Sequence, residues 1–229
     1  MLVSIRKYTA AFFMLLGLTA LFLIVIINSR FFYQLLLEPL HIPETSGFSR
    51  EEILLNYNCL IDYCSPLCRD ALEFPTFCSS ASALSHFAEV KNLFTALYLL
   101  APAGLLTSLY LIAQLPRRER SHAFGTAGRV CLVLPALLLC LCALSFHELF
   151  FDMHRLLFCN NDWLFDAVSD PVIRILPESF FLACAKALLL LLILAGVFLV
   201  TLEDLSTLRL RARLRSLRTR PRRTQSARP

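Results

Sequence analysis

Four long apolar stretches alternate with polar segments along the chain. Each stretch holds 16 to 21 residues without a charged side chain, and the last reaches about 23 residues when the preceding Phe180–Lys186 segment is included. A helix needs about 20 mostly apolar residues to cross about 30 Å of hydrocarbon. The pattern therefore predicts four membrane-spanning helices, at residues 8–28, 93–113, 130–146 and 180–202.

The polar segments predict how the rest of the chain is organised. If every stretch crosses the membrane, segments 29–92 and 147–179 lie on one side and together are long enough for a small folded cap. The short segment 114–129 lies on the other side, together with the two ends, 1–7 and 203–229. We therefore expect an all-α membrane protein in which two loops on the same side form a cap over four helices.

Composition supports a membrane protein and excludes a disordered chain. Hydrophobic residues make up 57% of the sequence and charged residues only 17%, against about 45–50% and about 25% in soluble domains. The first apolar stretch exceeds the 7–15 residues typical of a signal peptide, and no small-residue cleavage site follows it. We expect it to be retained as a membrane anchor.

The distribution of charge predicts the orientation in the membrane. Fifteen of the 22 basic residues lie on the side of segment 114–129 and the two termini, whereas 14 of the 17 acidic residues lie in the two long loops. Short positively charged segments stay in the cytoplasm. We therefore expect cytoplasmic termini and an extracytoplasmic cap. The Arg-rich tail at 203–229 is expected to contact anionic lipid headgroups and not nucleic acid.

The cysteines raise the alternative that the protein is a membrane thiol oxidoreductase. Five of the nine lie in the external loops, where disulfides persist, and four of these fall within twenty residues, which suggests a stapled loop of unassigned pairing. Membrane thiol oxidoreductases need a reactive C-x-x-C pair, and the chain has none. This alternative is less favoured. The external cysteines are Cys59, Cys64, Cys68, Cys78 and Cys159.

Ionisable residues gather at the outer ends of the predicted spans. Such groups are costly at membrane depth unless they are paired or hydrated, so they are candidate site residues. Aromatic side chains surround them, as they also do at ordinary membrane interfaces. A purely structural interpretation, with Lys186 extending to water, stays open. The candidates are His86, Glu89, Lys91, His147, Glu148, Glu178 and Lys186.

The histidines do not form a recognisable metal motif. A zinc-binding H-E-x-x-H helix would need a histidine where the chain has Phe151. His154 lies seven residues from His147 on the same helical face, so a metal pair of these two histidines stays open as a weak alternative. His154 matches no motif, and we expect it to be dispensable. We therefore predict no metal and no cofactor.

Several motifs resemble the bacterial lipoprotein intramolecular transacylases. The resemblance extends over nearly the whole chain, in the right order and topology, although Phe87, Glu89 and Ala167 differ from the family pattern as we know it. The motifs are residues 48–57, 85–94, 146–151, 162–166 and 176–180.

The resemblance implies an activity and a location. Such enzymes act at the extracytoplasmic face of the bacterial cytoplasmic membrane. They move the sn-2 acyl chain of a diacylglyceryl lipoprotein onto the α-amino group of its own N-terminal cysteine, which gives a lyso-form lipoprotein. The catalytic histidines of the family correspond to His86 and His147.

The chemistry of the transfer suggests supporting roles for the neighbouring charged residues. Glu89 or Glu148 would orient an imidazole, and Lys91 or Lys186 would stabilise the oxyanion. The remaining motif residues expected near the site are Tyr57, Trp163, Asp166 and Glu178. The competing interpretation is a non-enzymatic four-span scaffold or assembly factor, which leaves the two histidines at the membrane rim without a role.

Overall fold

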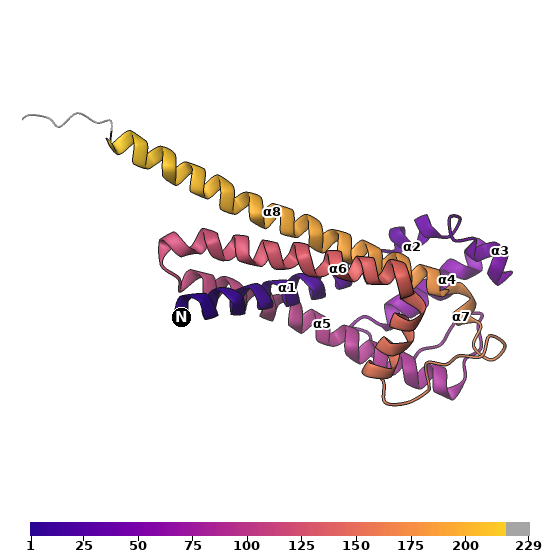
Figure 1. Ribbon diagram of the computed structural model, residues 1–229. Coiled ribbons are helices and arrows are strands. Elements are labelled where there is room, and N and C mark those ends of the chain that lie inside the picture. The colour runs from indigo at the N-terminus through magenta and orange to yellow at the C-terminus, as the bar shows by residue number, and fades with distance from the viewer. Residues whose placement is uncertain (219–229) are drawn as a thin grey trace, which may run out of the picture.

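The computed structural model describes the backbone of residues 1–218 and the side chains of residues 1–208. Its described part is entirely helical, and four long helices run side by side (Figure 1). All four are long and apolar enough to cross a membrane. The predicted all-α, four-span fold is confirmed. The long helices are α1 (Leu2–Asn28), α5 (Ala81–Ala113), α6 (Arg117–Leu157) and α8 (Glu178–Arg218).

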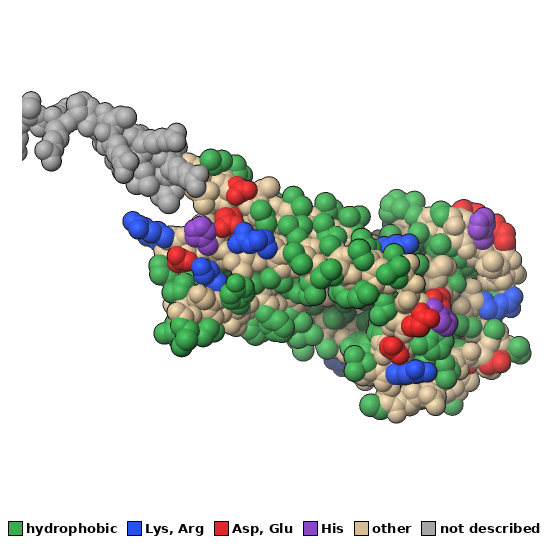
Figure 2. All heavy atoms as spheres, in the orientation of Figure 1, with side chains coloured by type: hydrophobic (Ala, Val, Ile, Leu, Met, Phe, Trp, Pro, Cys, Tyr) green, Lys and Arg blue, Asp and Glu red, His purple; other side chains and the backbone are tan. Residues whose placement is uncertain are grey.

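The polarity of the side chains changes along the axis of the bundle. Apolar side chains cover its middle, whereas charged side chains gather toward the two ends (Figure 2). Each predicted span lies inside one long helix, but the helices continue beyond the apolar stretches. Helix α5, for example, begins at Ala81, where the Ser80 hydroxyl accepts a hydrogen bond from the Ala83 N–H at 3.1 Å. A serine in this position satisfies one of the free N–H groups of the first turn.

Glycines allow close approach between pairs of long helices. A Cβ on Gly17 of α1 would lie 2.6 Å from the backbone nitrogen of Leu105, and a Cβ on Gly104 of α5 would lie 2.8 Å from the Gly17 nitrogen. Near this crossing, the Ser108 hydroxyl donates to the carbonyl of Ala10 at 2.7 Å. Small residues and inter-helix hydrogen bonds are the usual means of helix association in lipid.

We expect Gly17→Ala to destabilise the bundle. The added methyl group meets backbone, which cannot rotate away, so α1 and α5 must separate at a cost of about 1–3 kcal/mol. The thermal unfolding midpoint in detergent should fall. The control is Leu106→Ala, because Leu106 is 66% exposed on the outside of the bundle. Equal midpoints for the two variants would contradict the tight crossing.

A helical cap, defined as residues 29–80 and 158–177, covers one end of the bundle. Its helices are α2 (Arg30–Leu36), α3 (Ile42–Ser46), α4 (Arg50–Tyr63) and α7 (Val172–Ile175). The rings of Tyr33 and Tyr57 stack with centres 3.6 Å apart, and the Tyr33 hydroxyl donates to the Ile175 carbonyl at 2.7 Å. The two loops thus share one core.

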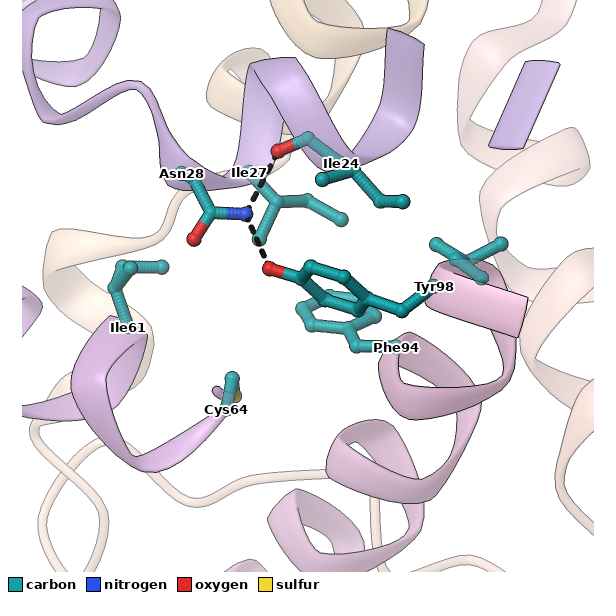
Figure 3. A pocket seen from close by; sticks show the side chains of 8 residues that line it. Ile24, Ile27, Asn28, Ile61, Cys64, Phe94 and Tyr98 are labelled. Carbon is teal, nitrogen blue, oxygen red and sulfur yellow. Dashed lines mark hydrogen bonds between the residues drawn. The ribbon is translucent and has the colours of Figure 1, made fainter. Parts of the chain in front are cut away.

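A small cavity marks the place where α1, α4 and α5 meet (Figure 3). The Asn28 amide donates to the Ile24 carbonyl at 2.8 Å and to the Tyr98 hydroxyl at 2.9 Å. The cavity measures about 10 Å³, the space of about one water molecule. Its lining residues come from both the cap and the bundle, so it marks the junction between them. It is too small to hold an acyl chain.

Helix α6 changes direction before it ends. Ser145 has non-helical backbone angles (φ −150°, ψ 51°), and beyond it the chain turns away from the bundle axis toward the cap (Figure 1). Residues 146–157, which we call the rim helix, therefore do not continue the predicted span. They run across the end of the bundle instead.

The end opposite the cap is held by ion pairs. Lys7 of α1 lies 2.7 Å from Glu119 of α6. The buried Glu203 of α8 accepts from Arg129 at 2.9 Å, and its other oxygen lies 2.7 Å from the His122 ring nitrogen. The N-terminus and the far part of α8 both lie at this end (Figure 1). His122 thus has a structural partner.

Candidate active site at the cap end of the bundle

His86 is the buried histidine of the structure. It lies in the second turn of α5 with 6% of its surface exposed. Its ring centre is 4.6 Å from that of Phe158, 5.5 Å from that of Phe165 and 6.1 Å from that of His154. An unpaired charge is costly in such an apolar surrounding, so burial favours the neutral imidazole.

One nitrogen of His86 has no partner. Its Nδ1 is buried and makes no hydrogen bond within the described residues. Buried polar atoms in folded proteins are nearly always hydrogen-bonded, and an exception calls for an explanation such as a ligand. His86 therefore has a buried hydrogen-bonding position, in an aromatic surrounding, that no described residue fills.

His154 of the rim helix faces His86. Its Nδ1 lies 2.7 Å from the Phe150 carbonyl. Because a carbonyl only accepts, this nitrogen carries the proton, which leaves Nε2 as the free acceptor of a neutral ring. The other face of the ring stacks on Trp163, with centres 4.9 Å apart and an angle of 29° between planes.

Hydrogen bonds tie this stack back to α5. The Trp163 indole N–H donates to the Asn160 carbonyl at 3.0 Å, and the Asn160 amide donates to Glu89 Oε1 at 2.8 Å. The second oxygen of Glu89, Oε2, is buried without a partner. Since Glu89 follows His86 by three residues, both lie on one face of α5. Two unpartnered polar atoms therefore lie on this face.

His147 lies farther along the rim helix. Its side chain is 64% exposed, and its Nδ1 lies 2.8 Å from Glu178 Oε2 at the start of α8. Its ring contacts Phe151, which in turn packs against Trp163. Two helical turns, about 10 Å, separate it from His154. In the described part of the chain no hydrogen bond or ring contact joins His147 to His86.

Residues 8–181 match the family described as lipoprotein intramolecular transacylase Lit. The chain belongs to this family. It is also similar to the solved structure of the membrane-integral lipoprotein intramolecular transacylase Lit from Bacillus cereus, with a TM-score of 0.86 and 26% identity over 92% of this chain and 98% of that chain.

Two further structures of the Bacillus cereus enzyme, with one histidine replaced by arginine or by alanine, also match. Both have TM-scores of 0.81 at 25% identity and cover 92% of this chain, with 94% and 96% of those chains. No curated protein sequence matches the chain significantly. The chain is thus a membrane-integral acyltransferase, as the motif resemblance implied, and the non-enzymatic scaffold interpretation is set aside.

Two other predicted site residues of the transacylase belong to the cap itself. Tyr57 is part of the cap core, where burial raises the pKa of its phenol well above its ordinary value. Asp166 accepts hydrogen bonds from the N–H groups of Val168 and Ser169, which lower the pKa of its carboxyl. Both residues shape the cap, and neither is joined to a histidine by a hydrogen bond or a ring contact in the described part of the chain.

The two lysines considered for the oxyanion lie in different settings. Lys91 donates to the Cys68 carbonyl at 2.8 Å and lies over the ring of Tyr63, 4.3 Å from its centre. Its ammonium group is therefore bound to the cap. Five residues separate it from His86, so the two side chains lie about 140° apart around α5. Lys186 is exposed on α8, and Glu148 is exposed on the rim helix. The site therefore gathers His86, Glu89 and Trp163 of the predicted residues, whereas His147 and Glu178 form a separate pair.

Sequence reasoning assigned His154 and Asn160 no role in the transacylase. A signal for His154 was present, because it lies two turns from His147 on one helical face. Nothing in the sequence distinguished Asn160, whose importance comes from a loop conformation. Among the described residues, no group of three or more His, Cys, Asp or Glu side chains is arranged to hold a metal ion.

Proposed function

We propose that the chain transfers the sn-2 acyl group of a diacylglyceryl lipoprotein to the α-amino group of the same molecule's N-terminal cysteine. The amine nitrogen attacks the ester carbonyl, and the bond between the acyl carbon and the sn-2 oxygen breaks. The products are an amide on the cysteine and a free hydroxyl on the glyceryl group. Atoms balance within one molecule, so neither water nor a second acyl donor is consumed.

The observation that carries this proposal is the unpartnered Nδ1 of His86 in a ring whose centre lies 6.1 Å from that of His154. An α-amino group has a pKa near 7.7–8.0 and must lose a proton before it attacks. A neutral imidazole accepts that proton and returns one to the departing glyceryl oxygen. The two imidazoles, His86 and His154, supply both an acceptor and a donor at one position.

The residues around the two histidines position the substrate and do not themselves take part in the proton transfers. The free Oε2 of Glu89 accepts a hydrogen bond from the incoming ammonium group, while its Oε1 holds the loop that carries Trp163. The aromatic rings exclude water, which favours amide formation over hydrolysis. Because nucleophile and ester belong to one substrate, holding them in register supplies much of the acceleration.

The sequence pattern assigns the second catalytic role to His147, and the geometry favours His154. We propose that His147 and Glu178 form an outer pair at the entrance to the site, joined to the centre through Phe151 and Trp163. The two assignments make different predictions for single variants, which are given in the Discussion.

The test of the reaction is a defined substrate in detergent or vesicles. Purified protein is incubated with a synthetic diacylglyceryl lipopeptide, and mass spectrometry locates the acyl groups. We expect one acyl chain to move to the amine at constant mass, and an N-acetylated lipopeptide to stay unchanged. Release of free fatty acid without amide formation would contradict the proposal.

We further propose that both termini are cytoplasmic and that the cap faces outward, in the bacterial cytoplasmic membrane. The asymmetry of basic residues is the support. A membrane-impermeant maleimide applied to intact cells should label single-cysteine variants that retain Cys78 or Cys159, both exposed on the cap side. A tag after residue 229 should be reached only after lysis, and the reverse pattern would overturn the topology.

A contact between the Arg-rich tail and anionic headgroups remains part of the proposal. The side chains of residues 209–229 lie outside the described part of the structure, so this step rests on composition alone. The proposal includes no role for nucleic acid.

We expect the cap cysteines to be dispensable for the chemistry. Burial raises the pKa of the Cys64 thiol to about 12 and also raises that of Cys59, so neither is a reactive thiolate near neutral pH. Replacing Cys59, Cys64, Cys68 and Cys78 by serine should leave acyl transfer detectable, although the thermal midpoint falls. Quinone-linked thiol oxidation by the purified protein would instead revive the oxidoreductase alternative.

A further inference from the structure

The rim helix, residues 146–157, has three distinct faces. At 100° per residue, six of its seven apolar side chains occupy an arc of about 120°. These are Phe146, Leu149, Phe150, Met153, Leu156 and Leu157.

The other two faces divide the polar residues. His147, Phe151 and His154 share the face that carries the ring contacts with Trp163 and His86. Glu148, Asp152 and Arg155 share the third face, where Asp152 and Arg155 lie 3.6 Å apart. An apolar face and a charged face on one helix are typical of helices that lie in a membrane interface.

Much of the apolar face is uncovered. Phe150 is anchored to α8 through Phe181 at 5.2 Å, whereas Leu149, Met153, Leu156 and Leu157 are exposed in the described structure. The same helix also exposes Leu137 and Leu144 within the predicted span, before the kink. Lipid covers such leucines in a bilayer, and the exposed apolar side chains of the rim helix follow directly after the kink.

We propose that the rim helix lies in the cap-side membrane interface, with its apolar face against the glycerol and upper acyl region of the lipids. The kink at Ser145 makes this possible, because a straight α6 would carry residues 146–157 out into water. The charged face then points to the headgroups and solvent. The imidazole of His154 is thereby held at the depth at which ester bonds of membrane lipids lie.

This position also gives the substrate a route. A diacylglyceryl group in the same leaflet can move along the apolar face and meet His154 while its acyl chains stay in hydrocarbon. This last step rests on the proposed function, whereas the lipid contact does not, so a measurement of depth distinguishes failure of one from failure of the other.

The depth test uses a single tryptophan as a probe. The chain has one tryptophan, so in a Trp163→Phe background either Leu156→Trp or Val168→Trp carries the only fluorophore. The two positions are matched, since Leu156 is 83% exposed and Val168, in the cap loop, is 84% exposed. Both variants are reconstituted into phosphatidylcholine vesicles with and without bromine near the glycerol end of the acyl chains.

We expect brominated lipid to quench the probe at position 156 and to leave the probe at 168 bright, with aqueous iodide giving the opposite order. The emission of the probe at 156 should also be blue-shifted. Equal behaviour of the two probes toward both quenchers would overturn the proposal.

A second pair of variants avoids any change at Trp163. In lipid nanodiscs, Leu156→Asp should lower the thermal unfolding midpoint because a carboxylate is costly against lipid, whereas Val168→Asp should leave it unchanged. Unchanged midpoints for both would also overturn the proposal. Acyl transfer measured on the same samples then reports separately on the substrate route.

Discussion

Replacing His86 by alanine is expected to lower the rate of acyl transfer by at least about 100-fold. General acid–base assistance by a positioned imidazole typically contributes about 10²–10⁴-fold. His86 is the buried ring whose Nδ1 has no hydrogen-bond partner among the described residues. The measurement is single-turnover conversion of the diacylglyceryl lipopeptide, followed by mass spectrometry.

Two controls separate chemistry from folding. His86→Ala removes a buried ring, so its thermal midpoint must be compared with that of the wild type at the assay temperature. His41→Asn serves as the matched histidine control, because His41 is exposed in the cap and has a positive φ of 52°, which asparagine tolerates. It should keep its activity. A folded His86→Ala protein with wild-type rate would refute the proposed mechanism.

His154→Ala should cost about as much as His86→Ala, whereas His147→Ala should cost less than about tenfold. The reason is position, since His154 faces His86 at 6.1 Å between ring centres while His147 is bonded to Glu178 on the exposed side. The same lipopeptide assay, run on both single variants at equal protein concentration, measures the difference.

The double variant adds a second criterion. Residues that act as a unit lose activity non-additively, so His86→Ala/His154→Ala should be about as inactive as either single variant. Glu178→Gln should follow His147→Ala, because it removes only the outer pair. If His147→Ala is inactive and His154→Ala retains activity, the pairing predicted from the sequence pattern is correct and the geometric assignment is wrong.

The sequence was sufficient to predict the membrane fold because few backbone structures are stable in hydrocarbon. Segments such as Leu93–Ala113 must form helices to satisfy their backbone, so hydropathy alone locates them. It could not locate the true helix ends. Ala81–Asn92 is polar enough to read as loop, yet Ser80 and the contacts of Phe87 with the cap extend α5 through it.

The main feature that the sequence could not predict is the direction of the chain after the third span. No proline or glycine stands at Ser145, and Pro135, inside the same helix, is ten positions earlier. Without the bend, His147 is the first histidine past the membrane and the natural partner of His86. With it, the helix runs across the bundle end and brings His154 inward. Short motifs identified the family, but they could not choose between two histidines on one helical face.

The shared core of the cap has a consequence for biosynthesis. Tyr33, near the first span, hydrogen-bonds to the carbonyl of Ile175 and packs against Phe180 at the start of the last helix. The first loop therefore leaves the ribosome long before its packing partners exist, and contacts between such distant segments form slowly. During synthesis, the aromatic side chain of Tyr33 stays uncovered until the start of α8 has been made. A chain truncated before residue 172 would expose them permanently and become a substrate for membrane quality-control proteases.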